Sequence, residues 1–289
     1  MEFELKDQQK IIVLIQLFEE IHKITNDANI NFDCNKMYFQ CLDEDKSAIM
    51  LGEIHADWFD HYNCKNDITI GINLEYFIIF LKSYKKDGIP TLKITFDENN
   101  QDKLFICFHP TNTKNPISNT ECQMNLFELE QELMQITHLV DCTDVVMPSS
   151  VFVDAINNLK HIKNSVKLQW NEDAIVFSST SPEIGTVKQS ICVANVEQYG
   201  IVEYEDQENI LFLSNKKLEL MASFCKLSKK IKLEMVPDVP LYATYYLFGN
   251  VATDDIDEEN AMDVERDQNE KQQNNAFFQF ILSPKTDNN

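Results

Sequence analysis

The sequence predicts an α+β protein with two similar domains, each made of two helices packed on antiparallel sheets. A short apolar strand, a residue able to cap a helix and an amphipathic helix recur four times, with expected caps at Asp7, Asn73, Ser149 and Ser214. The distance along the chain from Asp7 to Ser149 equals that from Asn73 to Ser214 to within one residue. The two halves therefore look like copies, and each half looks like two related smaller units.

The first half contains two predicted helices among eight predicted strands. The helix over 8–24 carries apolar residues at helical spacing, and a second helix is expected over 74–85. A hairpin is expected around Cys34 and Asn35, and another at the turn-forming DENNQD. The expected strands are MEFEL, INFD, MYFQCLD, SAIMLGEI, DITIGIN, TLKITFD, KLFICFHP and CQMNLFELE.

The second half repeats this order. A helix is expected over 150–162, because Val151, Phe152, Ala155, Ile156 and Leu159 form one apolar stripe, and a second over 216–227. The expected strands are DVVMPS, SVKLQWN, AIVFSST, GTVKQSICVAN, ILFLS, KIKLEMV, PLYATYYLF and AFFQFILSP. Each helix lies among several strands, which favours antiparallel sheets over the strict alternation of a parallel sheet.

Composition shifts suggest the domain boundaries. Residues 1–127 and 145–289 are expected to form the two domains, with 128–144 as a connector that carries few apolar residues. Residues 251–274 hold nine acidic and two basic residues with almost nothing to bury, which is typical of a disordered insertion.

The overall charge and the motif content exclude several function classes. A formal net charge of −22 argues against a simple basic nucleic-acid binder. Six scattered glycines cannot build a phosphate-binding loop, and neither a zinc-protease helix nor a serine-hydrolase elbow is present. No cofactor is expected. Eight irregularly spaced cysteines and short apolar runs indicate reduced thiols in a protein without membrane segments.

One segment could hold a metal ion. HADWFDHYNC offers His55, Asp57, Asp60, His61 and Cys64 as possible ligands. The spacing matches no usual site, and in an extended segment Asp60 and Cys64 would point away from the other three. A strand with polar ends is the favoured interpretation, and the alternative is a metal-dependent enzyme using His55, Asp57 and His61.

Thirteen lysines lie in or just beyond the four predicted helices. Cations near helix C-termini are favoured by the helix dipole and need no partner. They would instead form a basic face for phosphates if the fold placed all four helices on one side. The lysine pattern alone leaves both interpretations open.

Seven runs, spread in order over nearly the whole chain, are familiar: MYFQCLDEDKSAIMLGEI, FDHYNC, IGINLEYFIIFLK, MNLFELEQELMQI, VVMPSSVFVDAINNLKHI, VPDVPLYATYY and ILSPK. In this order they resemble the proliferating cell nuclear antigen family of DNA sliding clamps. The resemblance implies the DNA clamp, or processivity, fold and a non-enzymatic subunit of a homotrimeric ring. The helices would line a central hole, and edge strands near 122–129 and 186–194 would pair between subunits.

The resemblance also implies partners. They are duplex DNA, encircled without sequence specificity, DNA polymerase, a clamp loader and other proteins that carry a short clamp-binding peptide. The expected location is the nucleus, or a viral replication site if the chain is virus-encoded. A subunit of a heterotrimeric checkpoint clamp and an acidic scaffold that never encircles DNA are the remaining alternatives.

The resemblance assigns two sets of site residues. Lys82, Lys216 and His161 match basic positions of the family's hole; Lys10, Lys160, Lys163 and Lys226 are candidates to compensate for Ile12, Val13, Asp154 and Asn157, which stand where relatives carry basic residues. The expected DNA-facing residues are Lys10, Lys82, Lys160, Lys163, Lys216, Lys226 and His161. The expected partner-peptide groove consists of Leu42, Lys46, Met134, Ile136, Pro240, Ile281 and Ser283.

Overall fold

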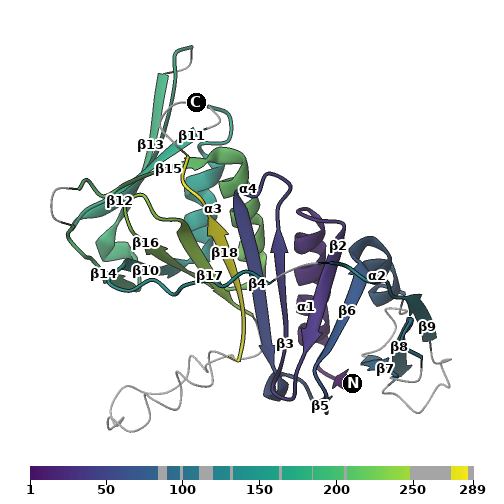
Figure 1. Cartoon of the computed structure of the whole chain (residues 1–289). Helices are drawn as coiled ribbons and strands as arrows, with labels where there is room; N and C mark the ends of the chain where they lie inside the picture. The colour runs from purple at the N-terminus through teal and green to yellow at the C-terminus, as the bar shows by residue number, and fades with distance from the viewer. Residues whose placement is uncertain are drawn as a thin grey trace, which may run out of the picture. The chain divides into compact units, whose positions relative to one another are not determined.

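The computed structural model describes residues 1–83, 90–97, 100–110, 120–130, 133–162, 165–183, 185–204, 207–247 and 275–285. The chain forms two compact units (Figure 1). Unit 1 comprises Met1–Cys41, Leu51–Met134 and Tyr246–Phe278, and unit 2 comprises Leu42–Met50, Gln135–Tyr245 and Gln279–Asn289. In each unit two α-helices accompany antiparallel sheets, which confirms the predicted α+β class.

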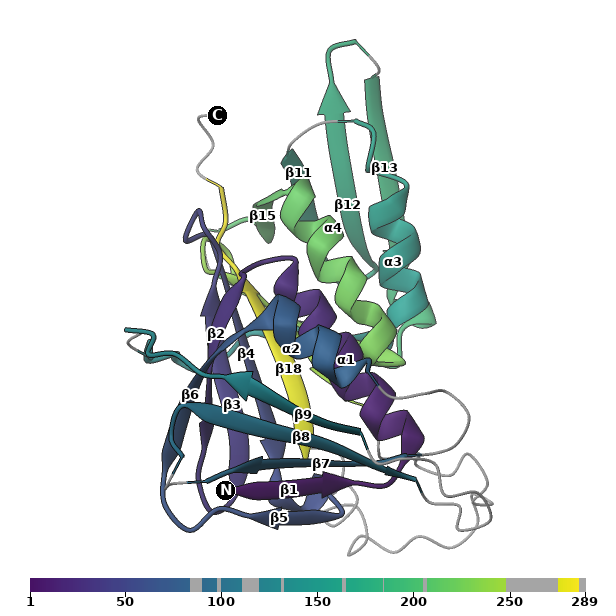
Figure 2. The same cartoon turned by 90° about the vertical axis from the view of Figure 1, so that its right-hand side faces the viewer.

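Unit 1 contains helices α1 (Gln8–His22) and α2 (Leu74–Leu81) and the short helix η1 (Ala56–Trp58). One sheet has the order β5-β1-β7-β8-β9, which Figure 2 shows edge to edge, and the other strands follow the order β18-β4-β3-β2-β6. The strands are β1 (Glu2–Leu5), β2 (Asp27–Phe32), β3 (Lys36–Leu42), β4 (Ala48–His55), β5 (His61–Asn63), β6 (Ile68–Asn73), β7 (Pro90–Phe96), β8 (Lys103–Pro110), β9 (Thr120–Asn125) and β18 (Ala276–Leu282). Strands β4 and β18 contribute residues to both units.

The core of unit 1 lies where the two helices meet the sheets. The Phe18 ring of α1 packs edge-on against Phe77 of α2, with ring centroids 4.9 Å apart, and lies 6.1 Å from Phe39 of β3. All three rings are buried. Since burying a side chain of this size contributes about 1.5–3 kcal/mol, these contacts fix the helix pair on its sheet.

Unit 2 has a matching set of elements. Its helices are α3 (Ser149–Asn157) and α4 (Asn215–Ser223), with the short helices η2 (Val193–Asn195) and η3 (Phe224–Leu227). One sheet has the order β13-β12-β11-β15, and the other strands follow β14-β10-β16-β17-β18. The strands are β10 (Thr143–Pro148), β11 (Ser165–Trp170), β12 (Ala174–Ser181), β13 (Gly185–Cys192), β14 (Gln198–Gly200), β15 (Ile210–Ser214), β16 (Lys230–Met235) and β17 (Leu241–Tyr246).

Aromatic side chains also organise the core of unit 2. Phe152 of α3 meets Phe177 of β12 edge-on at 5.9 Å, and Phe224 of η3 lies 5.9 Å from Phe280 of β18. The two helices lie side by side in both views (Figures 1 and 2), and the Asn215 amide donates a hydrogen bond to the Leu159 carbonyl. The helix pair is thus joined to both sheets.

The fourfold pattern is confirmed, since each of the four α-helices directly follows a strand. Asp7 and Asn73 accept hydrogen bonds from the first turns of α1 and α2, as predicted. Ser214 occupies the cap position of α4 without a side-chain bond. The prediction for Ser149 was wrong: it is the first residue of α3 and Pro148 takes the cap position, while the Ser149 backbone N–H donates to the Lys229 carbonyl just before β16.

The helices and most strands lie where the sequence predicts them, but several of their ends differ from the prediction. Residues 158–162 form a turn and not helix, and α4 gives way to η3 at Phe224. The three-residue strand β14 was missed because it is too short for an alternating pattern, whereas β5 lies in the segment HADWFDHYNC that was expected to be a strand. The strand predicted to continue to Leu129 ends at Asn125, because the chain then leaves β8 and Phe127 forms an isolated antiparallel bridge with Gly71 of β6. The Phe127 carbonyl approaches so closely there that a side chain at Gly71 would collide with it.

Residues 251–274, predicted to be a disordered insertion, lie outside the described residues. Among those that the structure does describe, no helix is long and apolar enough to cross a membrane.

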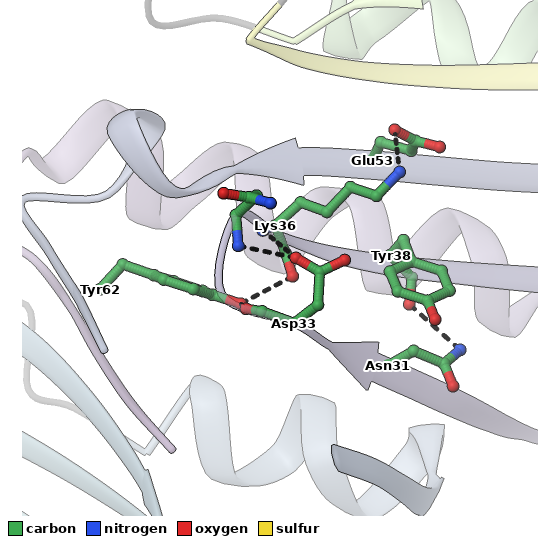
Figure 3. Close-up of polar contacts among 7 residues, drawn as sticks. Asn31, Asp33, Lys36, Tyr38, Glu53 and Tyr62 are labelled. Atoms are coloured by element: carbon green, nitrogen blue, oxygen red, sulfur yellow. Dashed lines mark hydrogen bonds and ion pairs between the residues drawn. The ribbon is translucent and has the colours of Figure 1, made fainter. Parts of the chain in front are cut away.

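In unit 1, Tyr62 of β5 closes the hairpin turn between β2 and β3 (Figure 3). Its hydroxyl lies 2.8 Å from the Asp33 carbonyl oxygen and 2.7 Å from that of Lys36. Burial raises the pKa of Tyr62 above its usual 10.0, so the hydroxyl stays protonated and donates. The Lys36 ammonium in turn pairs with Glu53 at 2.8 Å, which links the turn to β4.

Replacing Tyr62 should therefore destabilise the protein. Tyr62→Phe is expected to lower the free energy of unfolding by about 1–2 kcal/mol, because it removes the donor shared by two part-buried carbonyl groups. Urea unfolding measures this change. Tyr38→Phe is the matched control, since among the described residues the Tyr38 hydroxyl has no hydrogen-bond partner; equal effects of the two substitutions would contradict the assignment.

In unit 2, the Asp43 carboxylate joins the turn before β4 to helix α4. Its Oδ1 accepts hydrogen bonds from the backbone N–H groups of Ser47 at 2.7 Å and Ala48 at 2.9 Å. Its Oδ2 accepts from the Ser47 hydroxyl and from the Lys217 ammonium of α4. The Asp43 side chain is only 4% exposed and that of Lys217 14%, so this ion pair is largely withdrawn from water.

The pair shifts both pKa values. Burial alone would raise the pKa of Asp43, but hydrogen bonds from Lys217, Ala48 and Ser47 outweigh it and hold the pKa below the usual 3.8. Burial would likewise lower the pKa of Lys217, but Asp43 and the more distant Asp45 raise it above 10.5. The stability due to Asp43 is thus present above 3.8 and lost as pH falls through its lowered pKa, while that due to Lys217 is lost only above 10.5.

Asp43→Asn should lower the free energy of unfolding by about 2 kcal/mol at neutral pH, because Lys217 then loses its buried counterion and keeps only the exposed carboxylate of Asp45. The difference from the unsubstituted protein should shrink as pH falls below about 4, where protonation of Asp43 removes the same charge. Urea titrations at a series of pH values measure both effects.

Asp45→Asn serves as the control, since this carboxylate is 76% exposed and lies 3.3 Å from Lys217. Its effect should stay within about 0.5 kcal/mol. A destabilisation by Asp43→Asn that does not change with pH would contradict the role of the charge.

Candidate DNA-facing and partner-binding surfaces

The two predicted DNA-facing lysines of unit 1 have partners within the protein. The Lys10 ammonium of α1 donates to the Trp58 carbonyl at 2.6 Å and lies 5.3 Å from the centre of the Trp58 ring. Lys82, which follows α2, forms an ion pair with Glu19 of α1. Each cation therefore stabilises the packing of a helix as well as adding positive charge to the surface.

The predicted DNA-facing residues of unit 2 that the structure describes are exposed to solvent. Lys160 and His161 lie exposed in the turn after α3, and Lys216 lies exposed in the first turn of α4. Neither Lys160 nor Lys216 forms an ion pair with any described residue. Lys226 is also exposed, in η3, and Lys163 lies outside the described residues. Within the described residues, the exposed predicted lysines without an ion pair, Lys160 and Lys216, thus lie on the helices of unit 2 or just after them.

The residues that replace the family's basic positions differ in exposure. Ile12 is 37% exposed on α1, whereas Val13 is buried in the core. Tyr76 and Ile79 of α2 are also exposed, so the outer face of the helix pair in unit 1 is partly apolar. On α3, Asp154 and Asn157 are exposed. At Ile12, Asp154 and Asn157 the non-basic side chain is therefore exposed, whereas at Val13 it is not.

Six of the seven predicted groove residues belong to unit 2. Leu42 and Lys46 flank the Asp43 turn, and the Ser283 N–H donates to the Ser47 carbonyl at 2.9 Å, which places the end of β18 beside this turn. Leu42, Ile136 and Pro240 are half-buried, Ile281 is buried, and Lys46 and Ser283 are exposed. Backbone contacts thus bring the turn and the end of β18 together.

The connector is held on both units by side chains that sequence reasoning missed. In unit 2, the Tyr242 hydroxyl of β17 donates to the Thr137 carbonyl at 3.0 Å, next to Ile136. In unit 1, the Gln40 amide exchanges two hydrogen bonds with the backbone of the seventh groove residue, Met134. Both partners are about a hundred positions distant along the chain, and no local pattern marks them.

Exposed apolar side chains also mark the connector. Val140 is 79% exposed, Leu133 48% and Met134 40%. Val140 and Leu133 were missed as candidates, although apolar residues within a polar segment are a signal that the sequence offers.

The possible metal ligands near β5 have separate partners. Asp60 accepts a hydrogen bond from the Lys6 N–H, Asp57 from the Asn275 amide, and the Cys64 thiol donates to the Asn66 carbonyl. Within the described parts of the chain, no three His, Cys, Asp or Glu side chains lie close enough together to hold a metal ion. Burial raises the pKa of the Cys41 and Cys225 thiols to about 12, so neither forms a thiolate at neutral pH.

Comparisons with known proteins match nearly the whole chain. The family model described as "Proliferating cell nuclear antigen, N-terminal domain" matches residues 2–133, and that for the C-terminal domain matches residues 138–253. A proliferating cell nuclear antigen of Chaetomium thermophilum is 26% identical over 247 residues, which cover 82% of this chain and 90% of that protein. The chain belongs to the proliferating cell nuclear antigen family of DNA sliding clamps.

Proposed function

We propose that this chain is the subunit of a homotrimeric ring that encircles duplex DNA and tethers DNA polymerase and other replication and repair proteins. Membership of the sliding-clamp family over both domains carries the proposal. The ring catalyses no reaction, and a separate loader opens it. Its place of action is the nucleus, or a viral replication site if a virus encodes the chain.

Two open sheet edges support ring closure. Strand β9 is the last strand of its sheet in unit 1, and β13 is the last strand of its sheet in unit 2. An edge strand presents backbone N–H and C=O groups that another strand can satisfy. Pairing β9 of one subunit with β13 of the next uses two different surfaces, so the contact is head to tail and can close a ring.

The charge distribution supports a sliding contact with DNA. The protein is strongly acidic, with 25 Lys and Arg against 47 Asp and Glu. A small number of lysines facing phosphates gives weak, sequence-independent attraction, which lets a closed ring move along the duplex. We assign this contact chiefly to the helices of unit 2, with Lys160, His161 and Lys216 at the surface.

A peptide groove on unit 2 is the proposed partner site. The half-buried apolar residues Leu42, Ile136 and Pro240 suit a short peptide that presents aliphatic and aromatic anchors from one helical turn. Exposed Val140, in the connector, adds apolar surface.

The ring itself is tested by mass and by function. Native mass spectrometry is expected to give three times the 33.6 kDa chain mass. With a loader, the purified protein should increase the length of DNA that a cognate polymerase extends per binding event on primed circular DNA. A stable monomer that gives no stimulation would overturn the proposal, and a monomer that assembles only with two different relatives would favour a heterotrimeric clamp.

The assignment of DNA contact to unit 2 predicts unequal effects of the lysines. Lys160→Gln combined with Lys216→Gln should weaken binding to a short duplex and reduce the dependence of log K on log salt by up to about two per subunit. Lys10→Gln combined with Lys82→Gln should reduce it less, because these cations already have protein partners.

Fluorescence anisotropy of a labelled duplex over a salt series measures both slopes. Thermal unfolding of each variant separates lost DNA contact from lost stability. Equal slopes for the two double variants would contradict the assignment.

A further inference from the structure

We propose that Lys217 is a positioning residue for the partner peptide, because its ammonium anchors the turn that carries Leu42 and Lys46 to helix α4. The inference rests on the peptide site proposed above and assigns a role to a residue outside that site. Lys217 neither lines the proposed groove nor faces solvent, and its side chain is 14% exposed.

The turn packs with a part of the chain that is distant from it in sequence. Residues Leu42–Met50 group with unit 2, although the chain on either side of them belongs to unit 1. Lys217 and Asp43 are 174 positions apart. The Ser283–Ser47 backbone bond and this ion pair are two long-range ties that hold the turn within unit 2. Of these two ties, only the ion pair depends on side chains.

One carboxylate has two tasks in this arrangement. Oδ1 of Asp43 closes the turn by accepting the N–H groups of Ser47 and Ala48, and Oδ2 receives the Lys217 ammonium. Lys46, at the tip, adopts a left-handed backbone with φ of 54°, which a non-glycine residue keeps only where its surroundings enforce it. The closed turn enforces it, and the ion pair fixes the closed turn on α4.

Neighbouring lysines of α4 therefore have different tasks. Lys216 is exposed and assigned to DNA, whereas Lys217 points to the turn. Consecutive helical residues point about 100° apart, so one helix can serve both surfaces. An acidic turn without this cation would leave Asp43 buried beside Asp45 and without an opposite charge.

The expected consequence is a loss of preorganisation. A partner peptide binds only the fraction of molecules in which the turn is closed and docked, so its apparent dissociation constant rises as that fraction falls. If removal of the ammonium leaves about a tenth of the molecules competent, affinity falls about tenfold.

The test uses the full-length protein and a fluorescent synthetic peptide with a glutamine, an aliphatic residue and two adjacent aromatic residues. Lys217→Met should weaken peptide binding about tenfold and speed hydrogen exchange at the Lys46, Ser47 and Ala48 amides. Lys217→Arg should restore both, because a guanidinium also pairs with a carboxylate. Lys230→Met, which removes an exposed lysine paired with Glu197 in the same unit, should leave peptide affinity unchanged.

Asp43→Asn removes the other partner of the ion pair and should also weaken peptide binding. It therefore tests the inference even if Lys217→Met folds poorly. Unchanged peptide affinity in folded Lys217→Met or Asp43→Asn protein would overturn the positioning role while leaving the proposed function intact. A peptide that fails to bind the unsubstituted protein would instead overturn the proposed peptide site, and the inference with it.

Discussion

The structure depends on the burial of one apolar stripe from each helix against an antiparallel sheet. Phe18 and Phe77 in unit 1 and Phe152 and Phe224 in unit 2 fill the space between helices and strands. Because these stripes fix the rotation of each helix, they also decide which residues remain outside. On α1 that outer face includes Ile12, and on α4 it includes Lys216. The helix surface available to DNA is therefore set by the core.

Side-chain pairing then decides how much of the exposed charge is available. Lys82 and Lys10 are basic residues at predicted positions, yet Glu19 neutralises the first and the Trp58 carbonyl and ring hold the second. Lys160 and Lys216 have no comparable partner among the described residues. Helices that contribute equally to the fold thus differ in the positive charge that they leave available to bind phosphates.

Local patterns were enough to predict the class, the helix positions and most strands, because strand alternation and helical periodicity are read within a few residues. The helix caps show the limit of prediction from local patterns. Asp7 and Asn73 cap as predicted, whereas Pro148 takes the cap position of α3 and the Ser149 N–H donates to the Lys229 carbonyl, eighty positions away. The Asp43–Lys217 ion pair and the hydrogen bond from Tyr242 to the connector join segments that are still farther apart in the chain. No local pattern reveals such contacts. The DNA-facing and groove residues came from a family resemblance and stay predictions.

The acidity of the chain is compatible with DNA contact because charge acts locally in salt water. At physiological ionic strength the Debye length is about 8 Å, so acidic residues beyond that distance are largely screened from a phosphate. What a phosphate senses is the nearest cation and that cation's own partners. A carboxylate beside a lysine, as Glu19 is beside Lys82, cancels more attraction than many distant ones. Placing Lys217 inward on Asp43 while Lys216 stays outward therefore lets α4 hold an acidic turn without losing its basic surface.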